Sequence, residues 1–169
     1  MNIRRGVESD AAALAELAAR TFKETFGADN RPEDMALHVA RSYGYAQQLA
    51  ELADPDVSTL LAELDGRLTG YTQLRVGSTP SCVTGESPVE LWRFYVAAAW
   101  HGRGVAQRLM NEVEIGARRP GPKTLWLGVW ERNDRARAFY AKCGFADVGE
   151  HVFLFGTDPQ TDRVMTMTL

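Results

Sequence analysis

The sequence predicts a single mixed α/β domain. Apolar residues alternate in some segments and recur at helical spacing in others along the whole chain, which indicates strands interleaved with helices. Asp65-Gly66 separates two strand-like runs, as a tight hairpin turn does. With 169 residues and no repeat, low-complexity segment or linker, residues 1–169 form one domain that is long enough to bury a core.

The helices are predicted where apolar residues return every three or four positions. The first begins after Asp10, whose side chain suits an N-cap, and Gly27 ends it. Gly44 is a candidate interruption of the second. We expect Pro120-Gly121-Pro122 to stop the third and Gly144 to end the fourth. The predicted helical stretches are 10–27, 33–53, 104–118 and 133–143.

The strands are predicted by short β-patterned runs bounded by turn residues. The polar segment 77–88 is a loop, and the turn 156–159 joins the last two strands. The predicted strands are 1–5, 57–64, 68–76, 89–96, 124–130, 146–155 and 163–168.

Composition excludes several classes of protein. Hydrophobic residues make up 45% and charged residues 24% of the chain, and no apolar run approaches the ~18 residues of a membrane span. The N-terminus has no apolar signal segment, and Cys82 and Cys143 lie far apart, so we expect a cytoplasmic protein. Three scattered histidines without a Cys-x-x-Cys pair predict no metal site.

The charge is slightly acidic and unevenly distributed. The net charge of -3 disfavours nucleic acid as a partner. Residues 1–60 hold 6 Lys and Arg against 10 Asp and Glu, a balance of -4, whereas 61–169 hold 13 against 12, a balance of +1. The acidic excess is either a solvated helical face or a wall that attracts a cationic substrate.

A glycine loop between a strand and a helix is the most informative segment. Strand 89–96 leads within five residues into His101-Gly102-Arg103-Gly104-Val105-Ala106, where a helical pattern begins. Converging backbone N–H groups and a helix N-terminus favour phosphate there, although a plain turn is the alternative. Gln107 replaces the third glycine of a dinucleotide fingerprint and no Gly-Lys-Ser/Thr follows, which disfavours a nucleotide-binding oxidoreductase and a P-loop.

Two motifs make the chain resemble the GNAT superfamily of acetyl-CoA-dependent N-acetyltransferases. The loop matches the family's Gln/Arg-x-x-Gly-x-Gly/Ala, with His101 at the first position. A second motif, Asn-x-x-Ala-x-x-Phe-Tyr-x-x-x-Gly-Phe, is complete from Asn133 to Phe145. The resemblance implies a twisted, mostly antiparallel sheet of about seven strands, helices on both faces, and a splayed strand pair that admits acetyl-CoA.

A narrower resemblance is to PaiA-type spermidine/spermine N-acetyltransferases. It covers Thr21–Phe26, Trp126–Asn133, and Gln160–Asp162 with Met165. It implies a polyamine acceptor, with an amino acid, an aminoglycoside-like compound or a protein N-terminus as alternatives. A non-catalytic acyl-CoA-binding module is a further one. PaiA-like chains tend to carry a glutamate where this chain has Trp92, whose aromatic face could hold a cation instead.

The resemblance also implies catalytic roles. Tyr140 would protonate the leaving thiolate, and Glu90, eleven residues before His101, would take the amine proton. Strand alternation predicts that Glu90, Trp92, Phe94 and Val96 share one face. A core aromatic and a solvated carboxylate are the alternatives for Tyr140 and Glu90, and a water chain could replace a single base.

The resemblance places the remaining site residues by motif and region. A backbone N–H near 94–96 would meet the oxyanion, and Asn133 would contact the cofactor or cap its helix. The partners implied are a small-molecule amine and, by analogy, a second copy in a homodimer, without nucleic acid or membrane. The expected cofactor-binding residues are Phe94, Tyr95, Val96, His101, Gly102, Arg103, Gly104, Val105, Ala106, Asn133, Phe139 and Tyr140. The expected substrate-binding residues are Glu24, Phe26, Asp29, Glu33, Asp34 and Trp92.

Overall fold

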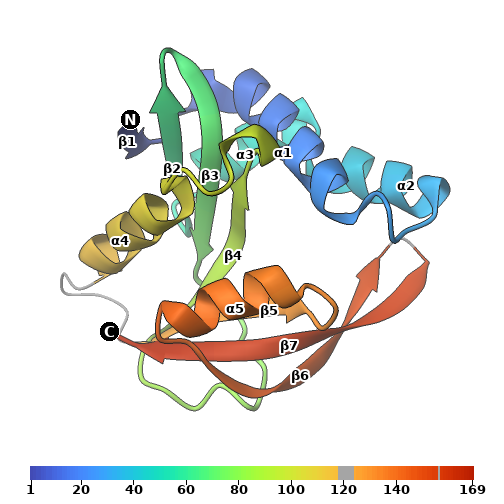
Figure 1. Cartoon of the computed structure of the whole chain (residues 1–169), viewed down its shortest axis with the longest axis vertical. Helices are drawn as coiled ribbons and strands as arrows, with labels where there is room; N and C mark the ends of the chain where they lie inside the picture. Colours follow the sequence, from blue (N-terminus) through green and yellow to red (C-terminus); the bar gives the residue numbers. More distant parts are fainter. Residues whose placement is uncertain (118–123, 156) are drawn as a thin grey trace.

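A seven-stranded sheet runs through the molecule (Figure 1). The computed structural model describes residues 1–117, 124–155 and 157–169. The strands are β1 (Asn2–Arg5), β2 (Val57–Leu64), β3 (Arg67–Arg75), β4 (Pro88–Val96), β5 (Thr124–Trp130), β6 (Ala146–Phe155) and β7 (Asp158–Thr168). They lie in the order β1-β2-β3-β4-β5-β7-β6, and every neighbouring pair is antiparallel except β4 and β5. The predicted mixed, mostly antiparallel sheet is therefore confirmed.

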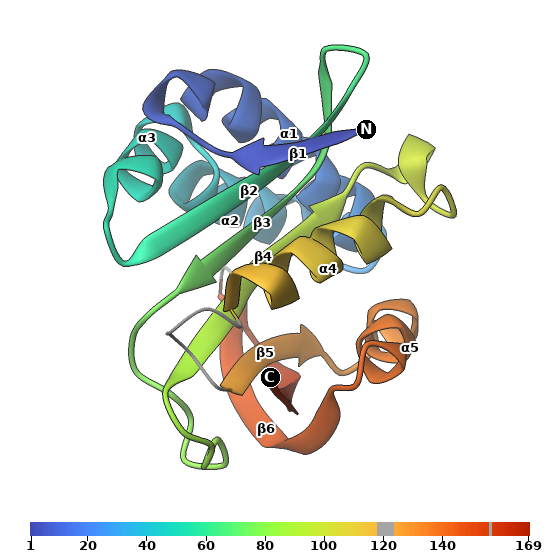
Figure 2. The same cartoon turned by 90° about the vertical axis from the view of Figure 1, so that its left-hand side faces the viewer.

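Helices cover both faces of this sheet (Figure 2). One face carries α1 (Ala11–Phe26), α2 (Pro32–Ser42) and α3 (Tyr45–Ala53), and the other carries α4 (Val105–Ala117) and α5 (Asp134–Lys142). Short 3-10 turns, Glu8–Asp10 and Ala98–Trp100, precede α1 and α4. No helix in the described ranges is long and apolar enough to cross a membrane.

The predicted boundaries hold at most elements, including the candidate interruption at Gly44, and fail at the start of β7. Stretch 33–53 is two helices, because Gly44 adopts an extended backbone and breaks it. Strand β7 begins at Asp158 rather than 163, because the β6–β7 hairpin continues beyond the end of β5. Pro159 has no N–H to donate, but it still lies opposite Leu154 of β6 in this part of the hairpin. The expected helix stop at Pro120-Gly121-Pro122 and the turn residue Gly156 lie outside the described residues.

Strands β4 and β5 separate soon after they meet. Their parallel pairing runs only from Pro88 opposite Thr124 to Glu90 opposite Trp126. Beyond that point the two strands diverge (Figure 2), and the backbone of each lacks the other as a partner. This is the splayed pair that the family resemblance implies.

A bulge in β4 changes which side chains share a face. Gln73 of β3 pairs with Arg93 and Leu74 pairs with Leu91, so Trp92 is the extra residue. Leu91 packs toward α4, and after the bulge Phe94 faces that same side. The prediction that Glu90 and Phe94 share a face is therefore wrong, because the inserted residue shifts the alternation by one.

A buried ion pair holds β4 directly after the bulge. The guanidinium of Arg93 contacts the carboxylate of Glu51 in α3, and both side chains are almost fully buried. Arg93 also donates to Gln73 Oε1 at 2.8 Å and to the Ser42 carbonyl at 3.1 Å. These bonds join β4 to β3, α2 and α3, so they fix the position of the strand where it leaves β5.

A second buried carboxylate fastens α2 to the β6–β7 hairpin, whose tip approaches the start of α2 in Figure 1. Asp34 Oδ1 accepts hydrogen bonds from the Thr157 backbone N–H at 2.9 Å and hydroxyl at 3.0 Å. Arg31 Nε donates to Asp34 Oδ2 at 2.8 Å. The bond from the Thr157 backbone N–H, followed by those from Arg31 and the Thr157 hydroxyl, holds the pKa of Asp34 below its usual value against the effect of burial.

The Arg93–Glu51 pair predicts a large cost for breaking it. Glu51→Gln leaves the buried guanidinium without its anion, so we expect the free energy of unfolding in urea to fall by about 3 kcal/mol. Glu150→Gln breaks an ion pair whose carboxylate side chain is 64% exposed, and should cost less than about 0.5 kcal/mol. Equal losses in the two variants would contradict the importance of burial.

The Asp34 contact predicts a pH-dependent stability. A carboxylate whose pKa is lowered by folding contributes stability above its unfolded pKa of about 3.9, and that stability disappears as the pH falls through the folded value. The difference in unfolding free energy between wild type and Asp34→Asn should therefore shrink from about pH 6 to about pH 3. Urea unfolding at a series of pH values measures it, and a constant difference would refute the assignment.

Candidate functional site

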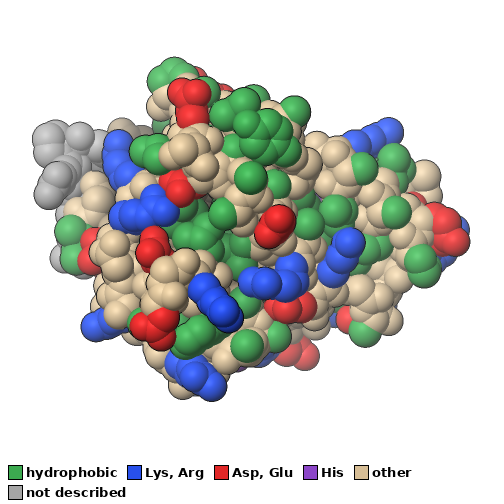
Figure 3. All heavy atoms as spheres, turned by 90° about the horizontal axis from the view of Figure 1, so that it is seen from above, with side chains coloured by type: hydrophobic (Ala, Val, Ile, Leu, Met, Phe, Trp, Pro, Cys, Tyr) green, Lys and Arg blue, Asp and Glu red, His purple; other side chains and the backbone are tan. Residues whose placement is uncertain are grey.

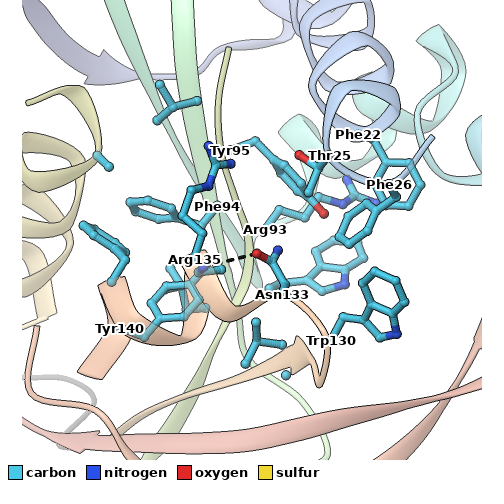
Figure 4. Close-up of a pocket in the computed structure, with 18 of the residues that line it drawn as sticks. Phe22, Thr25, Phe26, Arg93, Phe94, Tyr95, Trp130, Asn133, Arg135 and Tyr140 are labelled. Carbon is cyan, nitrogen blue, oxygen red and sulfur yellow. Dashed lines mark hydrogen bonds between the residues drawn. The ribbon is translucent and has the colours of Figure 1, made fainter. Parts of the chain in front are cut away.

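A cavity of about 810 Å³ opens where β4 and β5 diverge (Figure 4). We call one half of the cavity the α5 half, and it is lined by Phe94 of β4, Asn133 and Tyr140. We call the other half the hairpin half, and it is lined by Phe26 of α1, Trp130 of β5 and the inner side of the β6–β7 hairpin. Segments from both ends of the chain thus meet in one site.

The glycine loop forms the rim of the α5 half. Gly102 and Gly104 have φ angles of 73° and 78°, a left-handed backbone in which residues other than glycine are strained. Helix α4 begins at Val105, so the N–H groups of its first turn have no helical partners and carry the positive end of the helix dipole. Of the six predicted loop residues, all but Arg103 line the cavity. Arg103 lies over the Trp100 ring, 5.1 Å from its centroid, and lines a neighbouring hollow.

His101 ties this loop to two other elements. Its Nε2 lies 2.8 Å from the Val96 carbonyl, which can only accept, so Nε2 carries the proton. Its Nδ1 lies 2.7 Å from Nη1 of Arg135, which can only donate, so Nδ1 is the acceptor of this contact. The imidazole therefore links the end of β4 to α5. Arg135, which also lines the cavity, is a site residue that the sequence motifs did not indicate.

Helix α5 presents Tyr140 to the cavity. Asn133 Oδ1 accepts from the Ala136 backbone N–H at 3.1 Å, so this residue caps the helix and also lines the cavity (Figure 4). The Tyr140 ring packs edge-on against Phe94 and Phe139, with centroids 6.1 and 5.6 Å away. Burial raises the pKa of Tyr140 well above its usual value, with a smaller contribution from Cys143. The phenol is therefore protonated at neutral pH.

Glu90 and Trp92 line the cavity beside two arginines. Glu90 Oε2 accepts from Arg75 Nε at 3.0 Å and Nη2 at 2.6 Å. The guanidiniums of Arg75 and Arg93 each lie 4.0 Å from the Trp92 ring centroid. The indole thus already contacts two cations of the protein itself, which differs from the expected contact with a cationic substrate.

The four acidic residues expected to contact substrate do not line the cavity. The Glu24 carboxylate accepts from the Ala98 backbone N–H at 2.9 Å, and Asp34 is held by Thr157. Asp29 and Glu33 are exposed on the surface. Of the six residues expected to bind substrate, Phe26 of α1 and Trp92 of β4 line the cavity.

The hairpin half contains a polar pair that the sequence analysis left without a role. His151 of β6 and Asp162 of β7 are directly opposite each other, with Nε2 and Oδ2 3.7 Å apart. Burial raises the pKa of Asp162, and the nearby His151 opposes that shift. The same half contains His38, whose pKa is lowered to about 4 by burial and by Arg93. No group of three His, Cys, Asp or Glu side chains suited to a metal ion occurs within the described ranges.

One face of the molecule mixes both signs of charge. Figure 3 shows Lys and Arg side chains interspersed with Asp and Glu, and hydrophobic side chains in the hollowed part of the face.

The site combines a buried phenol in one half, a histidine–carboxylate pair in the other, and a glycine loop at the rim.

Comparison with solved structures gives the fold. The PaiA N-acetyltransferase from Thermoplasma acidophilum, crystallised with coenzyme A, superposes with a TM-score of 0.79 at 23% identity, covering 99% of this chain and 98% of that one. A ribosomal-protein-alanine N-acetyltransferase from Brucella melitensis superposes with a TM-score of 0.73 at 24% identity, covering 100% of both chains. At these identities the likeness is one of fold.

Comparison of sequences gives the family. The model of the acetyltransferase (GNAT) family matches residues 12–145. An uncharacterized N-acetyltransferase of Mycobacterium tuberculosis is 37% identical over 161 residues, 95% of this chain and 99% of that protein. Another, from Lactobacillus delbrueckii subsp. lactis, is 33% identical over 162 residues, 96% of this chain and 94% of that protein. The chain therefore belongs to the acetyltransferase (GNAT) family, and its activity is N-acetyl transfer of the GNAT type.

Proposed function

We propose that the chain transfers the acetyl group of acetyl-CoA to a primary amine, with a polyamine such as spermidine or spermine as the favoured acceptor. The observation that carries this proposal is the placement of Tyr140, a buried and protonated phenol, in the same cavity as the glycine loop. A non-catalytic acyl-CoA-binding module would have no need of that proton donor.

The chemistry of the cavity fits acetyl-CoA. The N–H groups of the first turn of α4 and the left-handed Gly102 and Gly104 suit a pyrophosphate. Arg135 adds a positive charge beside this loop. Residues 94–96 lie beyond the last β4–β5 pair, so their backbone groups on that side, apart from the Val96 carbonyl that His101 contacts, are available to the amides of an extended pantetheine arm.

The residues divide the reaction between them. The amine attacks the thioester carbonyl, and a backbone N–H of residues 94–96 stabilises the oxygen as it becomes negative. Tyr140 donates its proton to the departing sulfur. Glu90 lines the cavity, but its contact with Arg75 gives that carboxylate a role in holding Arg75 beside Trp92.

The hairpin half supports an extended cationic acceptor. Phe22, Phe26 and Trp130 present aromatic rings there, and aromatic faces attract ammonium groups. The Asp162 carboxylate adds an anionic group in the same wall. A cytoplasmic location and a homodimer stay predictions.

We expect polyamine-dependent release of free thiol from acetyl-CoA, with a much weaker response to amino acids, aminoglycosides and a peptide N-terminus. Tyr140→Phe should lower kcat by about 10²-fold or more, the size expected for a positioned proton donor, with unchanged acetyl-CoA affinity by calorimetry. Tyr45→Phe makes the same change at a side chain on α3 that is 58% exposed, and should leave kcat as in wild type.

The panel of amines separates the outcomes. Thiol release with another amine but not with polyamines would overturn the proposed acceptor and leave the reaction standing. Absence of release with every amine, despite tight acetyl-CoA binding, would overturn the proposed catalytic function as well. Equal kcat values for Tyr140→Phe and wild type would remove Tyr140 from the mechanism.

A further inference from the structure

His151 and Asp162 form a pair whose place in the fold is set by the hairpin register. Strand β6 pairs with β7 so that these two residues are directly opposite, and both side chains point into the hairpin half of the cavity. The side chain of His151 is 34% exposed and that of Asp162 is 16% exposed. Both groups line the cavity, and the imidazole is the more exposed of the two.

Gly128 of β5 makes room for this pair. A Cβ atom at Gly128 would lie 3.0 Å from Nε2 of His151 and 3.2 Å from Oδ2 of Asp162. The bare backbone of β5 thus packs closely against the two polar groups and shields them on that side. On the next inward-facing position of β5, Trp130 is paired with Asp162 and contacts the ring of Phe26, 5.9 Å away between centroids.

The geometry sets the tautomer of His151. Its Nε2 faces the Asp162 carboxylate, which favours a proton on that nitrogen and leaves Nδ1 as a proton acceptor. A second proton on the ring makes an imidazolium, which the adjacent carboxylate stabilises. Burial raises the pKa of Asp162, and the contact with His151 counteracts that rise.

No other titratable side chain among the described cavity residues combines these properties. His38 of α2 is stacked among aromatic rings, and its low pKa prevents it from holding a proton at neutral pH. Glu90 is bound by Arg75, and both nitrogens of His101 are engaged. The remaining titratable or charged side chains that line the cavity are Tyr43, Arg75, Arg93, Tyr95, Arg135 and Tyr140.

We propose that His151, oriented by Asp162, is the base that accepts the proton of the acceptor amine, an inference that rests on the proposed transfer to an amine. The ammonium N–H bond breaks, and its proton moves to Nδ1 of His151. The freed lone pair forms the new C–N bond, and the C=O electron pair moves onto the oxygen of a tetrahedral intermediate. The carbonyl then re-forms and the C–S bond breaks. The sulfur takes the Tyr140 proton, the second proton of the attacking nitrogen restores Tyr140, and His151 releases its proton to solvent. Asp162 is a positioning residue in this scheme.

Steady-state kinetics with spermidine, or with whichever amine of the panel the wild type acetylates, tests the role of His151. We expect His151→Gln to lower kcat/KM for the amine by about 10²-fold at pH 7, the size of general-base catalysis, with unchanged acetyl-CoA affinity. Added imidazole should restore part of the rate in His151→Ala. A rate for His151→Gln within about twofold of wild type overturns the proposal, and so does a 10²-fold loss confined to Glu90→Gln.

Asp162→Asn tests the positioning role. We expect it to lower kcat/KM for the amine by about tenfold, because the ring loses the anion that orients it. Asp147→Asn is the matched control, since Asp147 pairs with Arg163, whose side chain faces the opposite side of the hairpin from Asp162. It should leave the rate unchanged. A control that behaves as Asp162→Asn overturns the specific role of Asp162.

Nitrogen NMR of the imidazoles gives a readout that needs no acceptor. In the wild type at neutral pH we expect His151 to carry its proton on Nε2 with Nδ1 bare, and in Asp162→Asn we expect a weaker preference for this tautomer. A proton on Nδ1 in the wild type, or a preference that Asp162→Asn leaves unchanged, overturns the proposal. A wild type that acetylates no amine instead overturns the proposed function, and the NMR spectra still decide the pairing.

Discussion

The structure depends on two parallel strands that pair over three positions and then separate. Unpaired backbone N–H and C=O groups inside a protein cost free energy unless water or a ligand satisfies them. The gap between β4 and β5 is thus a slot whose walls are hydrogen-bonding groups already in an extended conformation. The buried Arg93–Glu51 pair holds β4 in place at the point of divergence, and the bulge at Trp92 sets which side chains enter the slot.

The cavity separates opposite chemical tasks along its length. The α5 half combines a glycine loop with a phenol that burial keeps protonated, which suits a phosphorylated donor and a leaving group that needs a proton. The hairpin half combines aromatic rings with the His151–Asp162 pair, which suits an amine that must lose a proton. His101 joins the end of β4 to α5, so the rim of the first half is fixed by hydrogen bonds within the protein.

Features encoded in short segments were predictable from the sequence. The loop from His101 to Ala106, the helix capped by Asn133 and the Asp65-Gly66 hairpin each depend on residues close together in the chain, and each is present in the structure. The interruption at Gly44 belongs to the same class, because a local backbone conformation breaks the helix there. These segments set the fold class and the rim of the cavity.

Features that depend on distant partners were not predictable. The bulge at Trp92 is defined by pairing with β3. The apposition of His151 and Asp162 follows from the register of the β6–β7 hairpin, and the predicted last strand, 163–168, left Asp162 outside it. Glu24 and Asp34 read as free acids in sequence, but backbone N–H groups 74 and 123 residues away bind them. A carboxylate near a site is free to contact substrate only if no other group of the protein already binds it.

Amide chemical-shift mapping on addition of coenzyme A tests the central claim most directly. If the slot between β4 and β5 holds the cofactor, the largest shifts fall on residues 94–96, on the loop from Gly102 to Ala106 and on the end of β5, while β1 and β2 stay unchanged. Shifts centred on the neighbouring hollow beside Met1 and Leu64, with residues 94–96 unaffected, would contradict this account.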